Sequence, residues 1–479
     1  MRKLPAAILL LILVLSGAYC AASYWVGAQA QKQYEILLAQ VSRPNSVEIA
    51  TTKYDRGIFL STAQTSVTVT LQGKEEPLNF TLVNTIQHGP LAMLSNPHAT
   101  RRFQPVQAVI TTRLAPAAEN GNMVRKALEE VPELASSEIW TVLYLDGSGE
   151  SYADVPAFQK KFKDAQGAET FLDWGGFHSR SHFDIALNEG AGTFNAPWIK
   201  LNEKGEWLNV RETRGEFSAR ADRNDVTVGD MSIACKGVDF TSGDGNVPFR
   251  LESPGIETGS GGSGDTVNGF VRFHFDKLAA EGGAYGPFSM ELEARKLDAA
   301  ALSRFQKNLR EIGASEKSGK DVTKALNSCY MQLLTGLAAK SPEIELKELR
   351  LGSDKGDFTA TAKIVVAGSG FSLDNPILLL LSGISANADV FVAEPLLSFA
   401  VEKSLTGALK VEGGPSDDEA ASLAKQRTAK TIEQLLAQNY LVRDGASMKV
   451  SAAYKAGRIT VNGRKIPITD LLKGGPALN

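Results

Sequence analysis

The stretch VEIATTKYDRGIFLSTAQTSVTVTLQG, residues 47–73, decides the fold of much of this chain. On both sides of YDRGIF, β-branched residues alternate with polar ones at the two-residue period of a half-buried strand. The YDRGIF segment between them contains Gly57 and has the length of a tight connection. The stretch therefore predicts two paired strands with one face packed and the other face wet or covered by another element.

Alternating runs of the same kind recur through the first half of the chain. They read LNFTLVNTIQHG, FQPVQAVITTRLA, EIWTVLYLDGSGESYADV, HFDIALNEGAGTFNAPWIKL and TVNGFVRFHFDKLAA. We therefore expect residues 44–296 to be a β-rich region built on a large, mostly antiparallel sheet. The predicted fold class is α+β, with the helices concentrated in the second half.

Residues 297–479 are expected to form an α+β region. Apolar residues at helical spacing predict helices through Leu302–Ile312 and Val322–Leu337. A third helix is expected after Ser416, which forms a capping box with Glu419. The region ends in YKAGRITVNGRKIPITDLL, which predicts a strand, an Asn-Gly turn, a second strand and a brief helix.

Residues 1–43 are expected to be a membrane anchor followed by a helical stalk. No charged residue occurs between Lys3 and Lys32, and roughly 20 apolar residues suffice for a helix to cross the hydrocarbon core. The segment Leu4–Val26 meets that length. The residues expected to mark the span and its aromatic interface are Leu4, Leu10, Leu15, Tyr24 and Trp25.

Two other fates of this segment stay open. Cleavage after Ala30 would follow the small residues of AQA, and lipidation would use Cys20, although the bulky Tyr19 before it fits lipoprotein processing badly. Retention is favoured because the apolar run exceeds the usual length for a cleaved signal. Since Arg2 and Lys3 should stay in the cytoplasm, the chain is expected in a bacterial inner membrane, as a single-pass protein with its body in the periplasm.

Composition narrows the possible partners. With a formal net charge of -3, the chain has no broad positive field, so no nucleic-acid partner is expected. Of its 3 cysteines, Cys235 and Cys329 lie outside the apolar segment. They are a candidate disulfide in an oxidising compartment, and the alternative is a pair of buried thiols.

Enzymatic chemistry is the less favoured interpretation. The sequence lacks the nucleophile elbow, the Walker loop and the paired-ligand motifs, so no catalytic, cofactor-binding or metal-ligating residue and no cofactor are assigned. His178 and His182 would lie about 13 Å apart on a strand, too far to share one metal ion. The glycine spacing in ETGSGGSGDT fits a dinucleotide loop, but a strand follows it, so we expect a hairpin tip there.

Three segments carry a resemblance to a known family: YDRGIFLS at 54–61, QHGPLAM at 87–93, and the tail. In order and spacing they resemble the YdgA family of bacterial inner-membrane proteins of unknown function. The resemblance implies a single N-terminal anchor, a periplasmic body and homodimers, without an established reaction. The residues of these motifs, of unknown role, are Tyr54, Arg56, Gly57, His88, Gly89, Pro90, Tyr454, Gly457, Asn462 and Gly463.

Two non-enzymatic functions fit these features. The leading one is an envelope protein that acts through a protein partner or self-association. The other is a module that binds or transfers a lipid or another hydrophobic ligand on a curved sheet. The two functions differ in what covers the inner face of the sheet. A ligand-binding module would leave this face open, whereas an interaction protein would have it filled by the helices of the second half. The strong apolar stripes of these helices favour filling, and hence the interaction protein.

Overall fold

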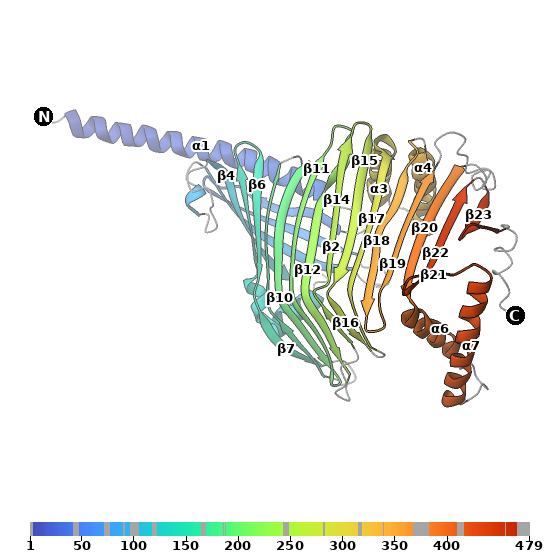
Figure 1. Cartoon of the computed structure of the whole chain (residues 1–479). Coiled ribbons are helices and arrows are strands. Elements are labelled where there is room, and N and C mark those ends of the chain that lie inside the picture. Colours follow the sequence, from blue (N-terminus) through green and yellow to red (C-terminus); the bar gives the residue numbers. More distant parts are fainter. Residues whose placement is uncertain are drawn as a thin grey trace. The chain divides into compact units, whose positions relative to one another are not determined.

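The structure is a computed structural model, shown in Figure 1. It describes residues 3–41, 47–70, 77–89, 92–95, 105–116, 122–163, 169–184, 186, 188–242, 249–280, 283–314, 319–338, 340–366, 383–409, 416–455 and 457–466. The chain divides into two units. The first unit contains residues 1–221 and 307–327, and the second contains residues 222–306 and 328–479. The boundaries expected after residues 43 and 296 both lie inside these units.

The first unit is an antiparallel sheet with one long helix packed on it. The helix is α1 (Lys3–Val41). The strands are β1 (Val47–Asp55), β2 (Leu60–Val69), β3 (Leu78–His88), β4 (Val106–Pro116), β5 (Glu138–Tyr144), β6 (Ser148–Val155), β7 (Phe158–Lys163), β8 (Glu169–Trp174), β9 (Phe177–Asp184), β10 (Glu189–Glu203) and β11 (Glu206–Ala221). The short helical segments are η1 (Ala92–Ser95), α2 (Asn122–Glu130) and η2 (Pro132–Ser136).

These strands pair in the order β1-β2-β3-β4-β5-β6-β9-β10-β11, and β7 and β8 extend the sheet beside β10. The stretch 47–73 thus begins the sheet as predicted, because β1 and β2 pair antiparallel.

The second unit also contains antiparallel strands, together with two groups of helices. Its strands are β12 (Thr227–Thr241), β13 (Phe249–Glu252), β14 (Gly255–Ser263), β15 (Thr266–Phe275), β16 (Lys277–Ala280), β17 (Gly283–Asp298), β18 (Glu343–Ser353), β19 (Phe358–Val366), β20 (Ile384–Ala393), β21 (Val442–Asp444), β22 (Ser447–Lys455), β23 (Arg458–Val461) and β24 (Arg464–Ile466). The main order is β12-β14-β15-β17-β18-β19-β20-β22-β23-β24.

The helices after residue 298 are α3 (Ala299–Ala314), α4 (Gly319–Ala338), α6 (Glu394–Leu409) and α7 (Asp417–Ala437). At the start of α7, the Glu419 carboxylate accepts a hydrogen bond from the Ser416 backbone N–H at 3.1 Å, as the capping box predicts. For the part of the chain that is described, the structure confirms a mostly antiparallel sheet with some of the helices in the second half.

The N-terminal helix differs from the expected anchor at its inner end. Ser23, Val26, Ala30 and Tyr34 are buried at helical spacing, so this part of α1 packs against the sheet. The predicted span Leu4–Val26 is wrong in its last turn, because the sheet and not lipid surrounds Ser23 and Val26. Over residues 16–38, the part of α1 whose side chains the structure describes, and in the other described helices, no segment combines the length and the apolar character that a membrane crossing requires.

The glycine-rich stretch around Gly259 and the pair Cys235 and Cys329 are the subject of two further expectations. Gly259 and Gly261 lie inside β14, and only Gly264 lies at the turn, with φ +71°. A Cβ at Gly259 would lie 2.3 Å from the Phe270 ring on β15, so the glycine admits that ring. No disulfide joins Cys235 and Cys329 in the structure, and the Cys235 thiol donates to the Gly237 carbonyl at 3.3 Å.

Candidate functional site

The first candidate region is the sheet face beneath α1, which we call the covered face. Strand alternation puts Asn84, Ile86 and His88 of β3 on this face, opposite Ala63 and Ser61 of β2. Its apolar part is a core whose buried members are Ala30, Tyr34, Ala63, Ile86, Ala108, Ile110 and Leu143. Polar side chains on such a face must find partners within the protein.

Asn84 is the centre of one buried polar cluster. Its Nδ2 donates to the Tyr34 hydroxyl at 2.8 Å and lies 3.2 Å from Thr65 Oγ1, and its Oδ1 accepts from Thr112 Oγ1 at 2.6 Å. The Tyr34 and Thr65 hydroxyls also share a short hydrogen bond. Burial raises the pKa of Tyr34 above its usual value of 10.0, so the phenol stays neutral. The cluster therefore fixes the helix to three strands without a buried charge.

His88 holds the same helix about three turns earlier, at Ser23. Its Nδ1 lies 3.0 Å from the Ser23 carbonyl, which can only accept, so Nδ1 carries the proton and Nε2 accepts from the Ser61 hydroxyl at 2.9 Å. The ring lies against Gly27, where an added Cβ would be 2.4 Å from its Cε1 atom. Gly27 is therefore the residue that lets the helix approach His88 so closely.

The Ser61–His88 pair has the spacing of a nucleophile and base, but its surroundings do not suit that role. Ser61 is 1% exposed and His88 is 2% exposed, and α1 lies over both. Burial lowers the pKa of His88 below its usual value of 6.5, although the bond to Ser23 opposes the shift. A substrate has no access to this hydroxyl in the folded unit, so the arrangement works as a clamp between helix and sheet.

Two of the three family-like motifs meet at this clamp. The Tyr54 ring lies 6.2 Å from that of Tyr34, and Arg56 Nη2 donates to the Tyr24 hydroxyl at 2.6 Å. Gly57 shapes the β1–β2 connection, since a Cβ there would lie 2.2 Å from the Leu60 carbonyl oxygen. Gly89, with φ +108°, lies against the Ser23 side chain. Pro90 lies outside the described residues.

The third motif joins the tail hairpin to the end of α7. Asn462 and Gly463 have φ of 47° and 81°, as expected for an Asn-Gly turn. Asn462 Oδ1 accepts from the Ser451 backbone N–H at 2.7 Å, and its Nδ2 donates to the Asn439 carbonyl at 3.2 Å.

The other motif residues of this tail lie on β22 and at its end. Tyr454, on β22, pairs with Ala386 and Ile459, and Gly457 turns the chain into β23 with φ +73°. The helix expected after Thr469 lies outside the described residues.

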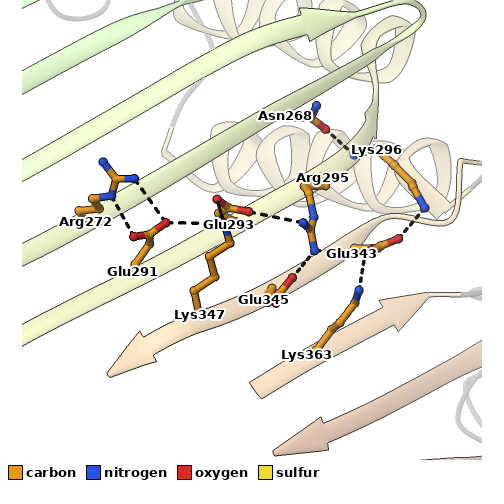
Figure 2. A network of polar contacts seen from close by, with 10 residues as sticks. All are labelled: Asn268, Arg272, Glu291, Glu293, Arg295, Lys296, Glu343, Glu345, Lys347 and Lys363. Carbon is orange, nitrogen blue, oxygen red and sulfur yellow. Dashed lines mark hydrogen bonds and ion pairs between the residues drawn. The ribbon is translucent and has the colours of Figure 1, made fainter. Parts of the chain in front are cut away.

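The second candidate region is the sheet of the second unit, whose two faces differ. One, the charged face, carries a network from β15 to β19 (Figure 2). Arg272 Nε lies 3.0 Å from Glu291 Oε2. Glu343 Oε2 forms ion pairs with Lys363 Nζ at 2.8 Å and with Arg295 Nη2 at 3.4 Å. The remaining members of the network are Asn268, Glu293, Lys296, Glu345 and Lys347. Hydrogen bonds from Lys296 and Lys363 lower the pKa of Glu343 to about 2.

The opposite side of the same strands, the apolar face, is made almost wholly of hydrocarbon. Register places Leu292 beside Leu346, and Ile344 beside Ile364. The other residues that alternation puts on it are Val271, Phe273, Met290, Leu349, Ala360, Ala362, Ala386 and Ala388.

Helices cover only the two ends of the apolar face within the described residues. At one end, Ile432 and Leu435 of α7 pack with Met448, Val392 and Val450 of the sheet. At the other, the start of α3 packs on Val267. Between these ends, Leu292, Ile344 and Ile364 remain 38%, 43% and 40% exposed. This is a contiguous apolar surface of the kind that soluble monomers keep small.

Sequence reasoning missed the buried polar cluster around Asn84 on the covered face. Its members are Tyr34, Thr65, Asn84 and Thr112. One signal could have found Asn84: in LNFTLVNTIQH it shares the strand face of Leu82 and Ile86, so a polar residue interrupts an apolar row. The sequence contained no comparable signal for its partner Tyr34, 50 positions away.

Comparison with known proteins identifies a family and gives no function. Neither the curated proteins nor the solved structures contain a match. Residues 1–469 match the family described as "Bacterial protein of unknown function (DUF945)". Because this match covers nearly the whole chain, the protein belongs to that family of bacterial proteins of unknown function.

Proposed function

We propose that this protein is a membrane-tethered, non-enzymatic envelope protein that holds a hydrophobic chain against the apolar face of its second unit. The observation that supports it is the exposure of Leu292, Ile344 and Ile364 in the middle of that face. A sheet face left unfilled by helices favours ligand binding over a closed core, which reverses the order of the two functions that the sequence suggested.

The side chains of the apolar face suit an acyl chain. Ala360 and Ala362 of β19 and Ala386 and Ala388 of β20 form a strip of short side chains. Ile344 and Leu346 of β18 flank this strip. With a strand spacing of about 4.8 Å, the strip has the width of one or two hydrocarbon chains. Few polar groups point from it, so a ligand would be held by apolar contact and not by directed hydrogen bonds.

The tether is the N-terminal segment. Leu4–Ala22 contains no charged residue, and as a helix it would measure about 28 Å, close to the hydrocarbon thickness of a bilayer. Arg2 and Lys3 favour a cytoplasmic N-terminus and a periplasmic body, with the bacterial inner membrane as the location. The resemblance to the YdgA family supports the same placement.

A photoactivatable long-chain fatty acid tests the ligand proposal. The full-length protein in lipid nanodiscs is mixed with the probe, irradiated and digested, and the labelled peptides are identified by mass spectrometry. Labelling should concentrate in residues 283–298 and 343–366. Ile364→Lys should reduce it about tenfold or more, because burying an unpaired charge costs over ~1.4 kcal/mol.

The matched control is Thr361→Lys, since Thr361 lies on the same strand but points to the charged face. It should leave labelling unchanged. Equal loss in both variants, or labelling spread evenly over the chain, would contradict the proposal. If instead light scattering finds a dimer that only Ile364→Lys dissociates, the face binds a second copy and the self-association hypothesis replaces this one.

A further inference from the structure

We infer that one end of the first sheet rests on the lipid bilayer, through an apolar collar around the point where α1 leaves the sheet. The inference rests on the tether proposed above and is independent of the apolar face of the second unit. Its partner is the bilayer at the boundary between headgroups and acyl chains.

Strand register brings several connections to the same end of the first sheet. Leu60, the first residue of β2, pairs with Gln87, and the next residue, His88, pairs with Ala108 of β4. Val106 pairs in turn with Tyr144, the last residue of β5. The β1–β2 connection, η1 and the β5–β6 turn therefore all lie at this end.

Each of these connections exposes large apolar side chains, which together we call the collar. The collar consists of Ile58, Phe59 and Leu60 in the first connection, Leu94 in η1 and Leu145 in the β5–β6 turn. Leu94 is 74% exposed and Leu145 is 58% exposed. Three separate loops with apolar tips at one sheet end are unusual for a surface that faces only water.

The helix provides the continuity with the membrane. Tyr19 stacks on Phe59 with ring centroids 5.5 Å apart, and Ser23 is bound by His88, so α1 leaves the sheet in the middle of the collar. Tyr24 and Trp25 are exposed there, which suits the aromatic composition of a membrane interface. The residues before Tyr19 are charge-free back to Lys3.

Arg56 adds the cation that such a boundary favours. Its guanidinium lies 4.6 Å from the Tyr24 ring centroid while its Nη2 bonds the Tyr24 hydroxyl. This places a positive charge at the edge of the collar, where lipid phosphates would lie. A protein partner at this end would have to share the surface with the emerging apolar helix, so the geometry favours lipid.

Fluorophores attached at single cysteines test this placement. In the full-length protein with Cys20, Cys235 and Cys329 replaced by serine, Phe59→Cys and Leu145→Cys are labelled with an environment-sensitive dye. The protein is reconstituted in phosphatidylethanolamine–phosphatidylglycerol vesicles, and lipids with a nitroxide near the headgroup serve as quenchers. Both dyes should shift to the blue and lose about half or more of their emission, as expected for probes at the boundary between headgroups and acyl chains.

The control is Ile139→Cys, an exposed apolar position at the opposite end of β5. A label there should remain open to aqueous iodide and unaffected by the lipid quencher. If labels at positions 59 and 145 behave like the one at 139 while the protein still floats with vesicles, the collar is refuted and the tether stands. If the protein does not float with vesicles at all, the tether itself has failed, and the collar with it.

Discussion

The covered face of the first unit and the apolar face of the second unit both arise from strand alternation, but in the described residues α1 lies over the first, whereas helices cover only the ends of the second. In the first unit, α1 lies over Ile86, which is 0% exposed, and polar groups such as Asn84 find buried partners. In the second, Ile344 is 43% exposed, with helices only at the ends of the face among the described residues. The difference shows that alternation predicts which residues share a face but not what covers it.

One large effect should come from the contact between the helix and the covered face. Gly27→Ala puts a Cβ 2.4 Å from the His88 ring, which must then leave Ser23 and Ser61. We expect a loss of about 2–3 kcal/mol of unfolding free energy in detergent, from overpacking and broken buried hydrogen bonds. Gly17→Ala on the same helix, with nothing within 4 Å, should be neutral or slightly stabilising. Equal melting of the two variants would show that α1 is not docked.

A pair of isoleucine substitutions compares the faces directly. Ile86→Ala should cost about 2–5 kcal/mol because it opens a cavity under α1. Ile344→Ala should cost under about 1 kcal/mol, since its side chain is already half exposed. Chemical denaturation of both variants measures the contrast. If Ile344→Ala proves as costly as Ile86→Ala, the apolar face is covered and the ligand proposal loses its basis.

The buried amide is the next test of the covered face. Asn84→Leu removes the donor to Tyr34 and the acceptor for Thr112, and we expect a loss of about 2 kcal/mol. Tyr34→Phe should cost less in the Asn84→Leu background than in the native protein, because the hydroxyl then has fewer partners to lose. A double-mutant cycle measured by thermal unfolding gives the coupling. Strict additivity would mean that the amide and the phenol do not interact.

Much of the fold was open to prediction from the sequence because its causes are local. The alternation in residues 47–73, the Asn462-Gly463 turn and the Ser416 capping box each act within a few residues. The contacts of the covered face could not be predicted from the sequence, because Tyr34 and Asn84 meet only when the helix docks. Nothing in the sequence around Tyr34 marks it as a polar partner. The sequence before Lys32 also does not show where α1 starts to pack on the sheet. Apolar residues such as Val26 and Ala30 fit against a sheet as well as in a membrane.

His88 gives the covered face a pH dependence. Because burial lowers its pKa below 6.5, the unfolded state binds more protons than the folded state just below that pH. Its contribution to stability should be complete above pH 6.5 and decline as the pH falls through that value towards the folded pKa. The slope cannot exceed about 1.4 kcal/mol per pH unit for one proton. His88→Asn should remove this component from melting curves recorded between about pH 7.5 and 5.

The smallest effect is expected on the charged face, which opposes the open apolar one. Glu343 has a pKa of about 2 because Lys296 and Lys363 bind its ionised form, so its contribution is present above the usual value of 4.5 and is lost as the pH falls towards 2. Since Lys296 is 56% exposed and Lys363 is 35% exposed, solvent screens both ion pairs, and Glu343→Gln should cost only about 1 kcal/mol at neutral pH. The cost should shrink in high salt and disappear as the pH falls through about 2, the folded-state value. Glu348→Gln, at an exposed position of the same strand, is the control for acid unfolding followed by circular dichroism. A Glu343→Gln cost that persists at low pH would mean that packing and not charge holds this face, and the contrast between the two sides of the sheet would need another explanation.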